Sequence, residues 1–100
     1  MKATLVTEIA KNYQSMLGHS IRVNGWIRSV RDSKTFGFIE LNDGSGFKNI
    51  QIVFDTNLHN FDDIVKFTTG SSVDVEGTLV ASEGAKQAYE VKATKVTLLG

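Results

Sequence analysis

"RDSKTFGFIELND", residues 31–43, carries the pattern that decides how this chain folds. Apolar and polar residues alternate along it, which is the period of a β-strand. Ile39 and Leu41 lie on one side, and this side is expected to face a core. Phe36 and Phe38 lie on the other side, which should face water. The strand is therefore predicted to expose two aromatic rings among polar neighbours, and these rings need an explanation.

The apolar spacing elsewhere predicts the remaining elements. Leu5, Ile9 and Tyr13 have helical spacing. The predicted helix spans residues 4–17, within a helical N-terminal extension of residues 1–18. A second helix is predicted within residues 57–69. The predicted strands cover residues 19–30, 36–42, 49–55, 72–81 and 88–99.

The order of these elements predicts the fold class. A helix, three strands, a helix and two strands match the five-stranded OB barrel, an all-β fold with short helices. A β-sandwich would need more strands, and a ferredoxin-like fold would need a helix where only "RDSKT" stands. Gly25 interrupts the first strand and predicts a bend or a close backbone approach. The side-chain parity slips between Ala93 and Val96, which predicts a β-bulge or a strand end.

Length and composition limit the functions that are possible. One hundred residues predict a single domain over residues 1–100, with little room for an enclosed catalytic pocket. The absence of cysteine excludes disulfides and thiolate sites and fits a reducing compartment. The beginning, "MKATLVTEIAKN", is predicted to be neither a signal peptide nor a membrane span. We therefore expect a cytoplasmic protein with no membrane partner.

Charge is balanced overall but unevenly distributed. Eleven basic and eleven acidic residues give a net charge of zero, which argues against non-specific coating of nucleic acid. One segment is nevertheless basic, with Arg22, Arg28, Arg31 and Lys34 against Asp32 alone. Such a flank suits a local contact with phosphate, but it equally suits a solvated strand edge. On charge alone the strand edge is the favoured interpretation.

No group of residues predicts catalysis. His19 and His59 have no partners at the spacing of a metal site or a catalytic triad, and surface positions are expected for both. Asp62 and Asp63 fit the first turn of a helix better than a metal site. We therefore predict no enzymatic activity, cofactor or metal for this chain.

The outward face of the first three strands remains as the candidate site. OB barrels bind single-stranded nucleic acid on this face by stacking bases on aromatic rings. Phe38, at mid-strand, is the predicted stacking ring. Gln51 can read a base edge, and Arg28 can contact phosphate or a base. Two readings stay open for the other rings, because Phe36 also suits a cap on the barrel end and Trp26 suits packing against a helix or a neighbouring domain.

Several stretches together resemble one family. They are "VNGWIRSVRDSKTFGFIELNDGS", "KNIQIVFD", "FTTGSSV" and "GTLVASEGAKQAYEVKA". They are similar to the N-terminal anticodon-binding domain of class II aminoacyl-tRNA synthetases of the aspartate, asparagine and lysine subgroup, and most similar to bacterial asparaginyl-tRNA synthetases. The resemblance covers about residues 1–99 and implies an OB fold that binds a tRNA anticodon loop, GUU for tRNA-Asn.

The resemblance also implies roles for single residues. Phe38 in "GFIEL" would stack on the central uridine, and Gln51 in "NIQIV" and Arg31 in "VRDSK" would hydrogen-bond it. Glu90 in "YEVKA" would contact a flanking base. Further RNA contacts are predicted for Arg28, Lys34 and Lys48 on phosphate, for Phe36 beside the stack, and for Lys86 in a closing loop.

The resemblance finally implies partners outside this chain. In the family a catalytic domain uses ATP and magnesium, and no such domain is recognisable here, so we expect a recognition module. The full enzymes are dimers, which makes a homodimer possible. Two alternatives stay open, a general single-strand binder and a protein-interaction or dimerisation module.

Overall fold

The computed structural model describes residues 2–82 and 87–100 of the chain. Its elements follow the predicted order of helix, three strands, helix and two strands. They are α1 (Val6–Met16), β1 (Ser20–Asp32), β2 (Phe36–Asn42), β3 (Ile50–Asp55), α2 (Phe61–Ile64), β4 (Ser72–Ala81) and β5 (Tyr89–Leu98). Among the described residues there is no helix with the length and hydrophobicity that a membrane span requires.

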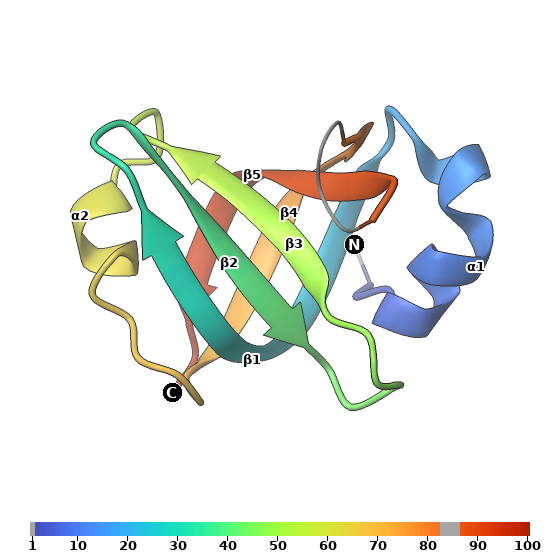
Figure 1. Ribbon diagram of the computed structural model, residues 1–100, viewed down its shortest axis with the longest axis horizontal. Coiled ribbons are helices and arrows are strands. Elements are labelled where there is room, and N and C mark those ends of the chain that lie inside the picture. Colours follow the sequence, from blue (N-terminus) through green and yellow to red (C-terminus); the bar gives the residue numbers. More distant parts are fainter. Residues whose placement is uncertain (1, 83–86) are drawn as a thin grey trace.

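The strands close into a barrel in the order β1-β2-β3-β5-β4 (Figure 1). Neighbouring strands are antiparallel except β3 and β5, which are parallel. β1 pairs with β4 through its first half and with β2 through its second half. A Cβ at Gly25 would stand 2.5 Å from the carbonyl oxygen of Asn42, so the close backbone approach predicted there is confirmed. The predicted OB barrel is likewise confirmed.

A β-bulge lies where the parity of the last strand slips. The register between β4 and β5 shifts between Glu76 and Gly77, which pair with Lys95 and Ala93. Thr94 is therefore the extra residue of the bulge, as the sequence predicted. The bulge returns Val96 to the inside of the barrel, where it is 2% exposed.

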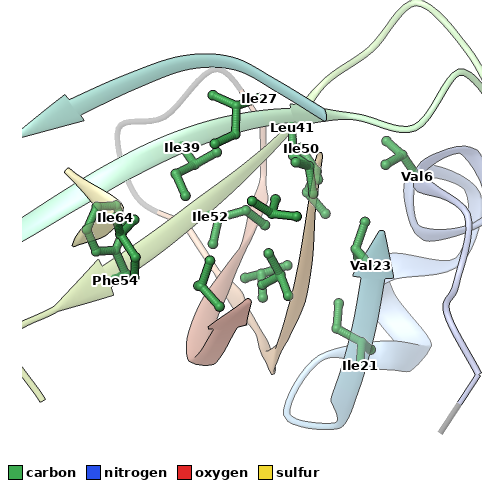
Figure 2. Packing of buried hydrophobic residues seen from close by; sticks show 14 of the residues in the cluster. Val6, Ile21, Val23, Ile27, Ile39, Leu41, Ile50, Ile52, Phe54 and Ile64 are labelled. Atoms are coloured by element: carbon green, nitrogen blue, oxygen red, sulfur yellow. The ribbon is translucent and has the colours of Figure 1, made fainter. Parts of the chain in front are cut away.

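The inside of the barrel is an apolar core (Figure 2). Ile39 and Leu41 of β2 are fully buried, which confirms the side predicted to face the core. They pack in one cluster with Ile50, Ile52 and Phe54 of β3. In the described part of the chain, no charged or amide side chain is buried with them. Burial of apolar surface therefore supplies the main driving force for this fold.

α1 lies at one end of the barrel and α2 at the other (Figure 1). α1 is one continuous helix that begins at Val6, later than predicted. Val6 and Ile9 are buried, whereas Leu5, predicted on the apolar stripe, precedes the helix and is 48% exposed. The prediction for Leu5 is therefore wrong. Tyr13 stacks on Tyr89 of β5 with ring centroids 4.8 Å apart and so attaches the helix to the barrel.

The turn between β2 and β3 provides the cap that α1 lacks. Leu5 makes no side-chain cap. The N–H of Val6 donates instead to Asp43 Oδ2 at 2.8 Å, and the N–H of Thr7 donates to Ser45 Oγ at 3.1 Å. Two of the free N–H groups at the helix start are thus satisfied from a distant segment.

α2 is a single turn, shorter than the helix predicted within residues 57–69. Phe61 and Ile64 are buried, and the Phe61 ring lies 5.5 Å from that of Phe54. Asn60 precedes the first residue of α2 but makes no side-chain cap. Its amide donates instead to the carbonyl oxygen of Val96 at 2.9 Å, which ties α2 to β5.

Candidate functional site

Phe38 lies at the centre of the outward face of β2. It pairs with Arg31 of β1 on one side and with Val53 of β3 on the other. The Arg31 guanidinium carbon lies 5.7 Å from the centroid of the Phe38 ring, within the range of a cation–π contact. Phe38 is partly buried among these neighbours, so its orientation is restrained while part of the ring meets solvent.

Phe36 stands beside Phe38, outside the barrel. The two ring centroids are 5.4 Å apart and the planes are nearly perpendicular, at 87°. Phe36 is 39% exposed. The inward residue between them is Gly37, where a Cβ would lie 2.4 Å from Cζ of Phe54. Phe54 therefore fills the space inside Gly37, and outside the barrel the Phe36 ring contacts the edge of the Phe38 ring.

A polar row crosses the strands next to this aromatic cluster. Gln51 Nε2 donates to Glu90 Oε1 at 3.1 Å, and Ser82 Oγ donates to the same oxygen at 2.7 Å. On the other side Gln51 pairs with Glu40, whose carboxylate accepts a long 3.4 Å hydrogen bond from Ser29 Oγ. The sequence pattern predicted Gln51 and the family resemblance implied Glu90, but neither indicated Ser82, which follows β4 and donates to Glu90 of β5.

The hydrogen bonds leave acceptors unused. Both donors to Glu90 reach Oε1, and in the described part of the chain no donor reaches Oε2. The Oε1 atom of Gln51 likewise accepts no hydrogen bond from a described residue. These oxygens can accept hydrogen bonds from N–H groups of a ligand, and the second N–H of the Gln51 amide can donate to one.

Arg28 occupies a β-bulge that the strand prediction missed. The register of β1 with β2 shifts between Ile27 and Ser29, so Arg28 is the extra residue. Ser29, not Arg28, therefore stands opposite Glu40 on the outward face, and the predicted alternation is wrong at this point. Arg28 is exposed. The three-residue spacing of Ile27 and Val30 in "IRSV" was the signal that could have revealed the bulge.

The other predicted contact residues lie in the connections between the strands or farther along the strands. Lys34 is exposed in the turn between β1 and β2, beside the aromatic cluster. Lys48 is exposed in the connection between β2 and β3. Lys86 lies outside the described residues. Trp26 lies on the outward face, but it pairs with Asn42, four residues from Phe38 along β2 and so about 13 Å away.

One ionisable group near this face has a shifted pKa. Burial of the Asp43 carboxyl disfavours its charged form. Hydrogen bonds from the Ser45 hydroxyl, from the Val6 N–H and from the Ser45 N–H outweigh that effect and lower the pKa of Asp43 below its ordinary value. Asp43 is therefore ionised at neutral pH and engaged with α1 and its own turn.

Comparison with known proteins identifies relatives over almost the whole chain. The model of the family described as OB-fold nucleic acid binding domain matches residues 21–99. The asparagine–tRNA ligase of Alkaliphilus metalliredigens is 59% identical over 98 residues, which are 98% of this chain and 21% of the ligase. That of Bacillus cereus is 53% identical over 100 residues, 100% of this chain and 22% of the ligase. The chain thus spans about a fifth of the length of the curated relatives it matches.

Solved structures share the fold. The asparaginyl-tRNA synthetase from Pyrococcus horikoshii complexed with asparaginyl-adenylate superimposes with a TM-score of 0.85 at 24% identity, over 99% of this chain and 22% of that chain. An OBody, AM1L10, bound to hen egg-white lysozyme superimposes with a TM-score of 0.79 at 20% identity, over 99% of this chain and 94% of that chain. At these identities the two structures establish the same fold.

Proposed function

The chain belongs to the family of OB-fold nucleic acid binding domains, and from this membership we propose that it binds the anticodon loop of a tRNA. The name of the relatives, asparagine–tRNA ligase, makes tRNA-Asn with the anticodon GUU the proposed ligand. The outward face of β1, β2, β3 and β5 would hold the loop. The mechanism is recognition without covalent chemistry.

The observation that carries the proposal is the restrained Phe38 ring beside the row of Gln51 and Glu90. A base stacked on an aromatic side chain contributes ~1–3 kcal/mol to binding. Once the ring fixes the plane of the base, its edge points along the sheet to fixed polar groups. The Gln51 amide offers a donor and an acceptor to the Watson–Crick edge of a uridine. Arg31, whose guanidinium carbon lies 5.7 Å from the centroid of the Phe38 ring, would contact the same base.

Phosphate contacts would come from the exposed cations around the face. Arg28, Lys34 and Lys48 are exposed and separated from one another along the chain. Affinity for nucleic acid rises with the number of neutralised phosphates, and a chain of net charge zero offers few such contacts. We therefore expect weak, salt-dependent binding by this chain alone and a main contribution of the base contacts to selectivity.

The test is a titration with stem-loops that differ only in the anticodon. The chain should bind GUU more tightly than GUC and UUU, measured by fluorescence anisotropy at fixed salt. Phe38→Ala should weaken binding of GUU by ~1–3 kcal/mol, and Gln51→Ala should reduce the preference for the central uridine. Neither variant should lower the thermal midpoint by more than a few degrees.

Phe67→Ala is the matched control, because Phe67 is also partly buried but packs near α2. It should leave affinity for GUU unchanged. Equal affinity for unrelated loops would instead indicate a general single-strand binder. An absence of salt-dependent RNA binding would indicate a protein-interaction module. Unfolding of Phe38→Ala would contradict the outward assignment of this ring.

The remaining parts of the proposal concern the longer protein. The chain would be the recognition module of an ATP-dependent asparagine–tRNA ligase, with ATP and magnesium used by a catalytic domain outside this chain. The recognition module itself would need no cofactor. A cytoplasmic location, where tRNA is charged, and a homodimer of the whole enzyme complete the proposal.

A further inference from the structure

We propose, on the basis of the function above, that the outward face carries a second stacking site for an unpaired base. Its two proposed rings are Trp26 of β1 and Phe47 of the connection after β2, at the opposite end of β2 from Phe38. Its ligand is a base of the same loop that flanks the bases read at Phe38 and Gln51. The recognition surface is thereby extended from the centre of the barrel face to the connection between β2 and β3.

Trp26 belongs to the same face as Phe38. The cross-strand partners of β1 and β2 place Trp26 beside Asn42 and Arg31 beside Phe38, and none of these four side chains is buried. The Trp26 ring lies against the turn after β2, since a Cβ at Gly44 would stand 3.1 Å from its Cη2 atom. The side chain is nevertheless 38% exposed. Trp26 is thus a large, positioned ring with surface left for a planar ligand.

Phe47 is the most exposed large apolar side chain in the described residues, at 106% of its reference area. Its backbone is nevertheless fixed on both sides. Asn42 Nδ2 donates to the carbonyl oxygen of Gly46 at 3.3 Å and to Oδ1 of Asn49 at 3.0 Å. The carbonyl oxygen of Asn49 in turn accepts a 2.6 Å hydrogen bond from Gln87 Nε2. An anchored backbone that holds a phenylalanine in solvent is the arrangement expected of a stacking ring.

The spacing of the two aromatic sites suits a single strand. Phe38 and Asn42 are separated by four strand residues, about 13 Å. OB folds contact at least about four nucleotides of a single strand, whereas Phe38 accounts for one base and the row of Gln51 and Glu90 for its edge and one neighbour. A bound loop therefore has further bases to place, and Trp26 lies on this face beyond Phe38, with Phe47 in the connection that follows β2.

The charges near this end agree with a nucleic-acid ligand. Lys48 follows Phe47 directly and is exposed, so a phosphate can pair with its ammonium group while the base meets the ring. The nearest carboxylate in the turn, Asp43, is satisfied by N–H groups of Val6 and Ser45 and by the Ser45 hydroxyl. Its negative charge is therefore partly compensated.

The single tryptophan of the chain reports directly on this site. A stem-loop with the anticodon GUU should quench or shift the fluorescence of Trp26, because a stacked base changes the surroundings of the indole. The free trinucleotide GUU is too short to occupy both sites and should leave the signal unchanged when it is bound at Phe38. A stem-loop that binds in a Phe38-dependent way without changing Trp26 fluorescence would overturn the proposal.

Variants of Phe47 separate stacking from simple apolar contact. Phe47→Tyr keeps a π-face and should retain binding of the GUU stem-loop. Phe47→Leu and Phe47→Ala should both weaken it about fivefold or more. Phe67→Ala is again the control, because Phe67 follows α2, at the opposite end of the barrel from α1 and the turn that α1 contacts, and affinity should not change.

The outcomes distinguish this proposal from the function on which it rests. If no stem-loop binds and Phe38→Ala has no effect, the anticodon-binding function itself fails. If binding depends on Phe38 but Phe47→Ala binds normally, only the second site fails. If Phe47→Leu preserves a self-association that Phe47→Asp abolishes in sedimentation, and RNA affinity is the same in both, the ring serves a protein contact and the second site is excluded.

Discussion

The two faces of β2 are built by opposite rules. On the inward face Ile39 and Leu41 are fully buried, and a side chain at Gly37 would collide with Phe54. Every position there is determined by the space available. On the outward face Phe38 is only partly buried, and its ring contacts the Phe36 ring and the Arg31 guanidinium. The same seven-residue strand thus carries the stability of the barrel on one face and its proposed recognition on the other.

The difference shows where this molecule can vary without unfolding. Apolar burial holds the inward face, and removal of one buried group leaves a cavity that the barrel cannot close. Hydrogen bonds between partly exposed groups organise the outward face, and each of these contributes little to stability because water competes for the partners. Substitutions on the two faces should therefore separate stability from binding.

The largest effect is expected for Ile39→Ala. Ile39 is 0% exposed, and its truncation should lower the free energy of unfolding by ~2–5 kcal/mol, measured by urea denaturation. The affinity of the folded fraction for a GUU stem-loop should not change. Its outward neighbour gives the comparison, because Phe38→Ala should show the reverse. Equal losses of stability in the two variants would contradict the separation of the faces.

Gly37→Ala should destabilise the folded state, because it adds a methyl group where the core has no space for one. The new Cβ would stand 2.4 Å from Cζ of Phe54, whose side chain is only 1% exposed and cannot move aside. We expect a loss of ~1–3 kcal/mol in urea denaturation. Gly100→Ala is the control, because a Cβ there meets nothing within 4 Å. A stable Gly37→Ala would mean that the inward face tolerates repacking.

The inward face is also the part that the sequence predicted best. Ile39 and Leu41 were assigned to the core from alternation alone, because burial on one side of a strand imposes a period of two. The bulge at Thr94 was found for the same reason, as an error in that period. The bulge at Arg28 also disturbs this period, because Ile27 and Val30 are three residues apart. It was missed because the alternation is regular as far as Ile27.

The contacts that organise the outer surface could not be predicted in this way. The cap of α1 joins Val6 to Asp43, 37 residues apart, and the Ser82 hydroxyl donates to Glu90, eight residues later. Such pairs depend on how two segments meet in space, and no local periodicity records them. Leu5 was placed on the apolar stripe of the helix, since helical spacing alone does not show that Leu5 precedes the first turn.

Asp43→Ala should have the next largest effect, because it removes the cap that the turn supplies to α1. A loss of ~0.5–2 kcal/mol is expected at pH 7, measured by thermal and urea denaturation. The loss should be accompanied by reduced protection of the first amides of α1 in hydrogen exchange. Asp62→Ala is the control, because Asp62 is exposed and its side chain makes no hydrogen bond to a described residue.

The stabilisation of the folded state by Asp43 should decrease as the pH falls. The pKa of Asp43 is lower in the folded state than its ordinary value of 3.8. The folded state therefore favours the ionised form, and the stabilisation is fully present above the unfolded-state pKa. It is lost as the pH falls through the lower folded-state pKa. The stability difference between the unmodified chain and Asp43→Ala should thus shrink below pH 3.8, and a difference that grows in acid would contradict the assignment.

The smallest effect is expected for Glu90→Gln, and it concerns selectivity instead of stability. The carboxylate can accept two hydrogen bonds from the imino and amino groups of a guanine, whereas an adenine presents an acceptor at the corresponding ring nitrogen. An amide has one donor and one acceptor and should tolerate both bases. The preference for GUU over AUU stem-loops should therefore fall by ~1 kcal/mol, at nearly unchanged stability.

Glu40→Gln changes a carboxylate on the same face, one strand away from Gln51, and should preserve the preference. If both variants lose it equally, the discrimination comes from the overall negative charge of the outward face and not from the oxygen of Glu90 that Gln51 and Ser82 leave unoccupied.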